Sequence, residues 1–181
     1  EPNEINQWGL DKINACHTWP ITKGNSNVMV AVIDQGIDKN HNEFANNYSS
    51  ISYDLINGGS PSVVRGSHGT EVSGVLGANH NGIQIAGVAP QTTLLSISHT
   101  LEISPTLSSH LATGFGYART NGAAIINNSW GDQGGRYYNN IHSAILEDAI
   151  RAALTSGRNG KGCVVVFAAG NWNQDGIDYP A

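Results

Sequence analysis

Short apolar runs that alternate with longer amphipathic stretches are the feature that most limits how this chain can fold. Val28–Ile33 is a continuous apolar run rich in β-branched residues, as expected of a strand covered on both faces. We predict further strands over Thr92–Ser98, Ala123–Asn127 and Cys163–Ala168, and helices over His68–Ala78, Ser108–Thr120 and Ile141–Thr155. Strands and helices in alternation predict an α/β fold in three layers, with a central, mostly parallel sheet and helices on both faces.

Length and charge limit the kinds of function. A length of 181 residues suits one domain or a large part of one. Only 13% of residues are charged and the net charge is -5, so we expect no nucleic-acid partner. No apolar run approaches the roughly 18 residues of a membrane span, so none is expected. The start at Glu1 rather than Met favours a processed, secreted or otherwise extracytoplasmic protein.

Two cysteines, Cys16 and Cys163, are too few for a disulfide scaffold. Two buried free thiols are favoured over a mutual disulfide, because free cysteine usually behaves as a small hydrophobic residue.

Polar residues stand where two predicted strands end. Asp34 directly follows the first apolar run, and Asn171 follows the last one after Gly170. Because ligands of open parallel sheets bind beyond the carboxyl ends of the strands, we expect both side chains at one edge. Gly69, beside His68, would let another segment come close. Alone, Asp34 and Asn171 could be turn residues and His68 a helix-start residue; their joint occurrence favours a site.

Four motifs occur in order: D-x-G-I-D at Asp34–Asp38, H-G-T at His68–Thr70, N-S-W-G at Asn128–Gly131 and A-A-G-N at Ala168–Asn171. Together they resemble the subtilisin-like serine proteases, or subtilases, and the resemblance extends from about Trp8 to Ala181. It implies that residues 1–181 form the N-terminal portion of a single subtilase catalytic domain, with a fold that is incomplete at its C-terminal end.

Some segments also look like the kexin-like proprotein convertases, among them Asp34–His41 and Ser156–Gly162. Those enzymes prefer paired basic residues and line their pockets with carboxylates. Gln35 stands where they commonly have a second Asp, so the resemblance implies a relaxed specificity. Possible pocket carboxylates are Asp132, Asp175 and Asp178, each of which could equally be a solvated loop charge.

The resemblance implies a serine endopeptidase that acts on polypeptides. His68 would be the general base. Asp34 would hold the imidazole in the correct tautomer, and Asn171 would donate its side-chain N–H to the oxyanion. Ser129, Trp130 and Gly131 would pair with an extended substrate and form one wall of the first specificity pocket.

The nucleophile is the part that is missing from the motifs. In the family it lies in a G-T-S-x-A motif downstream of the segment that corresponds to Tyr179–Ala181, and no G-T-S occurs in this chain. Ser67 and Ser73 lie near His68 but do not follow the family pattern. We therefore expect the serine in a missing or separate C-terminal remainder of the same domain. The alternative is a noncatalytic homologue or fragment that acts as a protein-binding scaffold.

The resemblance also implies a structural calcium site. Its ligands would be the carboxylates of Glu4 and Glu43, the amide of Asn81, and the carbonyls of Asn79, Ile83 and Ile85. Such a mixture of carboxylate, amide and carbonyl oxygens suits calcium, although an ordinary polar loop would have the same composition. Zinc is not expected, because the histidines lack metal-ligand spacing.

Overall fold

Five parallel strands form one sheet in the computed structural model, which describes residues 6–171 and 178–181. The strands are β1 (Met29–Asp34), β2 (Tyr53–Asp54), β3 (Thr93–Ser98), β4 (Ile125–Asn128) and β5 (Val164–Phe167), in the order β2-β3-β1-β4-β5. β1 lies at the centre, with β3 on one side and β4 on the other. The chain crosses over β1 between β3 and β4, and such a switch point is where parallel sheets commonly bind ligands.

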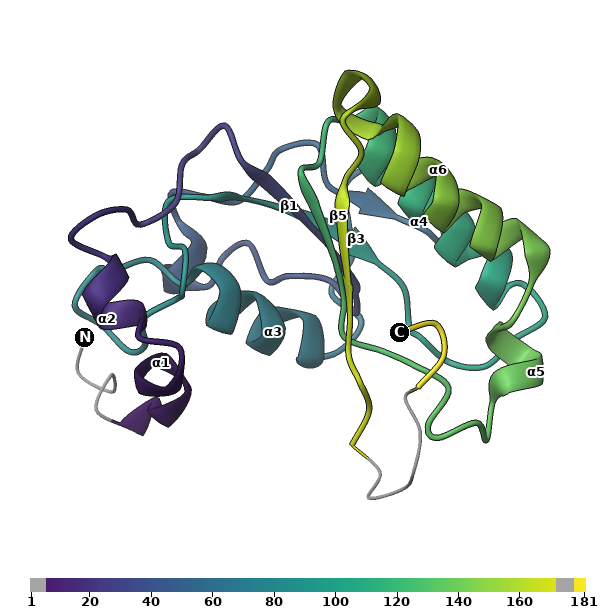
Figure 1. The fold of residues 1–181 in the computed structure, drawn as a ribbon, viewed down its shortest axis with the longest axis horizontal. Helices are drawn as coiled ribbons and strands as arrows, with labels where there is room; N and C mark the ends of the chain where they lie inside the picture. Colours follow the sequence, from purple (N-terminus) through teal and green to yellow (C-terminus); the bar gives the residue numbers. More distant parts are fainter. Residues whose placement is uncertain (1–5, 172–177) are drawn as a thin grey trace.

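Helices cover both faces of this sheet (Figure 1). α4 (Leu107–Thr120) and α6 (Ala144–Gly160) lie side by side on one face, and α3 (His68–Gly77) lies on the other. The smaller elements are α1 (Trp8–Lys12), α2 (Ala15–Thr18), η2 (Asn42–Phe44) and α5 (Tyr138–Ile141). The predicted α/β fold with a central parallel sheet between helices is confirmed.

The side chains of β1 alternate between two apolar cores, as the period of a strand requires. Ala31 and Ile33 point into the larger core, which α4 and α6 complete with Phe115, Leu146 and their neighbours. Val30 and Val32 point to the other face and pack in the core that α3 covers. Since β1 is buried on both faces, its sequence reads as a continuous apolar run.

Helix α6 differs most from its predicted range. It begins at Ala144 rather than Ile141, because Ser143 caps it and its hydroxyl accepts a hydrogen bond from the amide of Leu146. It extends past Thr155 to Gly160, but the backbone leaves helical geometry over 157–159.

The two cysteines lie in different environments. Cys163 is buried, its thiol donates to the carbonyl of Ala123 at 3.1 Å, and burial raises its pKa. Cys16 is exposed, so the expectation that both thiols are buried is wrong for this residue. Cys16 lies on the short helix α2, of which only Ala15 is buried.

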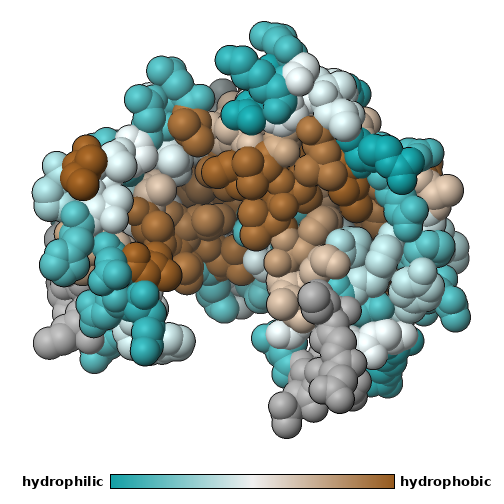
Figure 2. All heavy atoms as spheres, in the orientation of Figure 1, coloured by the Kyte–Doolittle hydropathy of each residue, from teal (hydrophilic) through white to brown (hydrophobic). Residues whose placement is uncertain are grey.

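In the part of the chain that the structure describes, β5 is left uncovered on the face of the sheet that carries α3. β5 is one of the two edge strands, and Val164 and Val166 are 54% and 44% exposed while Val165 and Phe167 pack in the larger core. Figure 2 shows apolar side chains gathered in a hollow in the middle of the molecule, where β5 and α3 lie in Figure 1. Large contiguous apolar patches are uncommon on the surface of monomeric soluble proteins.

None of the helices in residues 6–171 and 178–181 has the length and apolarity needed to cross a bilayer.

Candidate active site

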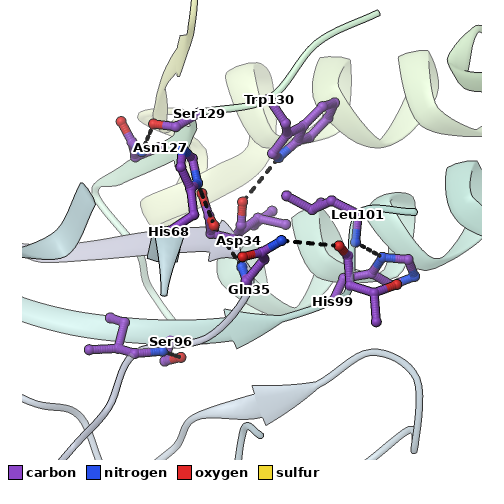
Figure 3. A network of polar contacts seen from close by, with 12 residues as sticks. Asp34, Gln35, His68, Ser96, His99, Leu101, Asn127, Ser129 and Trp130 are labelled. Carbon is purple, nitrogen blue, oxygen red and sulfur yellow. Dashed lines mark hydrogen bonds and ion pairs between the residues drawn. The ribbon is translucent and has the colours of Figure 1, made fainter. Parts of the chain in front are cut away.

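Asp34 and His68 meet at the carboxyl end of β1 (Figure 3). The Nδ1 atom of His68 lies 2.9 Å from Oδ1 and 3.0 Å from Oδ2 of Asp34. Asp34 is fully buried, whereas the His68 side chain is 48% exposed. In this geometry Nδ1 carries the proton that bonds to the carboxylate, so Nε2 of the neutral ring keeps a lone pair on the exposed side. The pair can therefore accept a proton from a group that approaches from solvent.

The carboxylate of Asp34 is held by its own strand end. The amide of Gln35 donates to Oδ1 at 2.7 Å, and the carbonyl of Asp34 accepts the amide of His99 at 2.8 Å as β1 continues alongside β3. A buried carboxylate that lacked such donors would carry a large desolvation cost. These contacts therefore position the side chain of Asp34 beneath the imidazole.

Two glycines allow α3 to begin this close to β1. A Cβ atom on Gly69 would lie 2.5 Å from the carbonyl oxygen of Gly36, a contact that backbone atoms cannot relieve. Gly36 itself has φ of 92°, in the left-handed region that favours glycine. The expectation that a glycine beside His68 permits a close approach is confirmed in this geometry.

The segment of Ser129, Trp130 and Gly131 follows β4 at the same edge of the sheet. The indole Nε1 of Trp130 donates to the carbonyl of Ile33 at 3.0 Å, which ties this segment to the residue before Asp34. Ser129 accepts a hydrogen bond from the Asn127 amide at 3.0 Å (Figure 3). The structure thus places the predicted substrate-binding segment beside the Asp34–His68 pair.

Asn171 is exposed and follows Gly170 after the end of β5, so it also lies beyond the carboxyl end of a strand. Of the three acidic residues considered for the pocket, Asp175 lies outside the described residues. Asp132 and Asp178 are buried, and both accept hydrogen bonds from backbone amides: Asp132 from Gly135 and Tyr179, and Asp178 from Gly134. These two are therefore not solvated loop charges, and they fix the loop that follows the 129–131 segment.

Neither serine beside His68 is placed to act as its partner. Ser67 is exposed at the start of α3, and Ser73 is fully buried on the same helix. Within residues 6–171 and 178–181 no serine hydroxyl hydrogen-bonds to His68, whose polar partner is Asp34.

The residues named for calcium partly converge on Glu43, which is 1% exposed. Its Oε2 accepts from the Asn81 side chain at 3.1 Å and its Oε1 from the amide of Ile85 at 3.2 Å. The amide of Asn79 bonds to the Glu43 carbonyl, and the amide of Ile83 to Asn81 Oδ1. Glu4 lies outside the described residues, and within them no cluster of three or more His, Cys, Asp or Glu side chains could hold a metal. A buried carboxylate with no basic partner in the described part still fits a cation.

Two polar clusters behind the Asp34–His68 pair were not predicted. In one, Arg65 forms a bidentate ion pair with the buried Asp54. In the other, His99 and His110 hydrogen-bond at 3.1 Å. No sequence motif marks these residues. Asp54 belongs to a two-residue strand, and His99 is buried by the tertiary structure.

Comparison with known proteins places the chain in a family. Residues 25–181 match the subtilase family. The chain is 34% identical to a calcium-dependent protease of Nostoc sp. over 86% of this chain and 25% of that protein. It is 31% identical to thermitase of Thermoactinomyces vulgaris over 97% of this chain and 58% of that protein.

Among solved structures, fervidolysin of Fervidobacterium pennivorans, a keratinolytic enzyme related to subtilisin, aligns with a TM-score of 0.71. The identity is 26%, over 91% of this chain and 24% of that one. The chain thus spans between about a quarter and three fifths of the length of these relatives. By its sequence match and its fold, the chain belongs to the subtilase family of serine proteases.

Proposed function

We propose that the protein is a serine endopeptidase in which this chain supplies the acid, the base and the oxyanion donor. The observation that carries the proposal is the Asp34–His68 contact of 2.9 Å, with the second imidazole nitrogen on the exposed side. In this role His68 takes the proton of a serine hydroxyl and later returns it to the leaving amine. Asp34 holds the ring in the required tautomer and stabilises the imidazolium that forms.

The proposed roles of the neighbouring segments follow from their place at the same edge of the sheet. Asn171 donates an amide N–H to the oxyanion of the tetrahedral intermediate. Ser129, Trp130 and Gly131 bind the backbone of an extended polypeptide, and the Trp130–Ile33 hydrogen bond keeps this segment at a fixed distance from Asp34.

The nucleophilic serine, in this proposal, belongs to further sequence of the same catalytic domain, of which residues 1–181 are the N-terminal portion. The uncovered apolar face over β5, with Val164 and Val166 half exposed, supports this assignment, because a continuation of the chain would bury it. The greater length of the relatives supports it as well. A resemblance to the minor extracellular protease Epr of Bacillus subtilis, 30% identical over 99% of this chain, favours an extracytoplasmic location.

A fluorophosphonate probe tests this function directly on the intact protein. We expect the probe to label a serine outside residues 1–181, and peptide substrates to be hydrolysed at a rate that the probe abolishes. Mass spectrometry of the intact sample would identify the polypeptide that carries the label. Absence of both label and hydrolysis would instead support the noncatalytic binding scaffold.

We further propose that calcium binds at Glu43 and the loop of Asn79–Ile85. Glu43 would contribute a carboxylate from the core side, and Asn81 and the carbonyls of Asn79, Ile83 and Ile85 would contribute the remaining oxygens, together with Glu4. The fit rests on the buried Glu43 carboxylate, which now accepts two hydrogen bonds but has no cationic partner in the described part of the chain. Calcium would supply that charge.

Removal of calcium should lower the thermal stability of the intact protein. If calcium is present at 100 times its dissociation constant, binding stabilises the fold by about 2.7 kcal/mol. That corresponds to a fall in Tm of about 5–10 °C for a domain of this size. Differential scanning calorimetry with EGTA and with EGTA plus excess calcium measures the shift. The Glu43→Gln variant is expected to respond little to either addition, and an unchanged wild-type Tm would argue against the site.

A further inference from the structure

We propose that the Asp54–Arg65 ion pair is a positioning device for the active site: it fixes the loop that delivers His68 to Asp34. The inference rests on the proposed function, because it assigns a role in the alignment of the same two residues. Neither Asp54 nor Arg65 contacts the reacting groups, so both would act through the backbone that they hold.

The pair is built to hold one geometry. Arg65 donates from Nε to Oδ1 of Asp54 at 2.9 Å and from Nη2 to Oδ2 at 2.7 Å. The hydroxyl of Ser98 and the amide of Asn57 each donate to the same carboxylate at 2.9 Å. With both oxygens doubly occupied, the planar guanidinium and the carboxylate are fixed in orientation as well as distance.

The pKa of Asp54 is consistent with an ionised carboxylate in this ion pair. Burial opposes ionisation, but the hydrogen bonds from Arg65, Asn57 and Ser98 and the positive charge of Arg65 outweigh it, so the pKa of Asp54 lies below its usual value. The Arg65 side chain is only 18% exposed and that of Asp54 only 1%, so solvent screens the pair weakly. The ion pair is therefore intact throughout the pH range in which a histidine base works.

The pair joins the edge of the sheet to the segment beside Asp34. Asp54 belongs to β2, which pairs with β3 through Ser98, and Ser98 in turn lies opposite Asp34 in the neighbouring strand. On the other side of the pair, the amide of Arg65 donates to the carbonyl of Gln35 at 2.7 Å. The ion pair thus links Ser98 and Gln35, the two residues that flank Asp34.

The loop that leads from Asp54 to His68 packs against the turn that follows Asp34. A Cβ atom on Gly36 would lie 2.5 Å from the carbonyl oxygen of Val63, so the loop rests directly on the backbone that follows Asp34. The amide of Val63 donates to the Ser98 hydroxyl at 2.9 Å. His68 follows Arg65 by three residues and opens α3. Any shift of Arg65 would therefore be transmitted to the start of the helix that carries the imidazole.

The other polar contacts of the loop, such as Ser62 to Ser52 and Val63 to Ser98, are single hydrogen bonds and fix orientation less than the bidentate pair does. Residues 57–66 contain no helix and form one isolated bridge, between Asp54 and Gly59. The imidazole is about half exposed and its polar partner is Asp34, so packing alone does not fix its position. A misplacement of about 1 Å in a catalytic group can cost on the order of 100-fold in rate.

The test compares Arg65→Gln, Arg65→Lys and the control Arg151→Gln in the intact protein. Arg151 forms an exposed ion pair with Asp148 on α6, at 3.6 Å. The control therefore makes the same Arg→Gln change in an ion pair that does not belong to the loop before His68. One readout is the downfield proton resonance of the His68 Nδ1–H bond to Asp34, and the other is kcat and KM for a peptide substrate. The resonance reports on alignment even if no hydrolysis occurs, so failure of the proposed function is distinguishable from failure of this inference.

In Arg65→Gln we expect the resonance to move upfield or broaden, kcat to fall on the order of 10- to 100-fold, and KM to stay unchanged. Arg65→Lys keeps the charge but loses the bidentate geometry, and should show the same changes to a smaller extent. Arg151→Gln should match wild type. A folded Arg65→Gln protein with wild-type resonance and kcat would overturn the proposal, as would equal losses in Arg151→Gln. Should Arg65→Gln fail to fold, wild-type values in Arg65→Lys would overturn it.

Discussion

Replacement of His68 by alanine in the intact protein is expected to abolish peptide hydrolysis. When the corresponding histidine is removed from subtilisin, a member of this family, kcat falls about 2 × 10⁶-fold, and we adopt that measured value as the expectation. In the proposed mechanism Nε2 of His68 accepts the serine proton, because Nδ1 is engaged by Asp34 and the side chain is half exposed. Without it, a serine hydroxyl would have to lose its proton to water. A loss of this size can be measured in end-point assays with a fluorogenic peptide that are incubated for days.

The control for this change is His17→Ala, on the exposed side of α2, which removes an imidazole far from the carboxyl end of β1. It should retain full hydrolysis. Fluorophosphonate labelling should fall in His68→Ala in parallel with kcat, because the same base activates the serine toward the probe. Hydrolysis that survives in His68→Ala would show that another group acts as the base.

The sequence predicted the elements that have a strong internal pattern. The core strands β1, β3, β4 and β5 appear within one or two residues of their predicted ranges, because buried parallel strands read as continuous apolar runs. The pairing of Asp34 with His68 was expected only from the resemblance to subtilases, whereas the strand pattern itself placed Asp34 and Asn171 at one edge of the sheet. Asp34 ends such a run, and the carboxyl ends of parallel strands share one edge.

The features that were missed depend on contacts between distant segments. β2 has two residues, too few for any period to emerge, yet it carries the Asp54 that binds Arg65. Helices α1 and α2 are five and four residues long, and no amphipathic pattern can be recognised at that length. Likewise, nothing in the local sequence shows that His99 would be buried between β3 and α4 beside a second histidine.

The hydrogen-bonded pair of the buried His99 and the partly exposed His110 predicts a loss of stability in mild acid. His99 is 2% exposed, and its Nδ1 accepts the amide of Leu101 at 2.9 Å, so its Nε2 carries the proton that bonds to Nδ1 of His110. Burial, followed by the charges of His110 and Arg65, lowers the pKa of His99 to about 4, although Asp54 opposes this. The folded protein therefore keeps His99 neutral where the unfolded chain already protonates it.

The direction of the pH effect follows from that difference. Between the unfolded pKa of 6.5 and the folded value of about 4, the unfolded state binds more protons, so the free energy of unfolding falls as the pH is lowered across this window. A pKa shift of this size lowers the free energy of unfolding by about 3 kcal/mol. This loss is nearly complete at pH 4 and is absent above pH 7. Asp54 does not contribute in this window, because its pKa is lowered from 3.8 and its stabilisation is lost only in stronger acid.

Urea denaturation of the intact protein at several pH values between 4 and 7.5 measures this dependence. Other groups titrate in the same range, so the informative quantity is the difference in slope between wild type and His99→Gln. A glutamine cannot take up the proton, and we expect the variant to lose about 3 kcal/mol less than wild type between pH 6.5 and pH 4. The exposed control His17→Ala should keep the wild-type slope. Equal slopes in wild type and His99→Gln would show that His99 is not the group that makes the fold sensitive to mild acid.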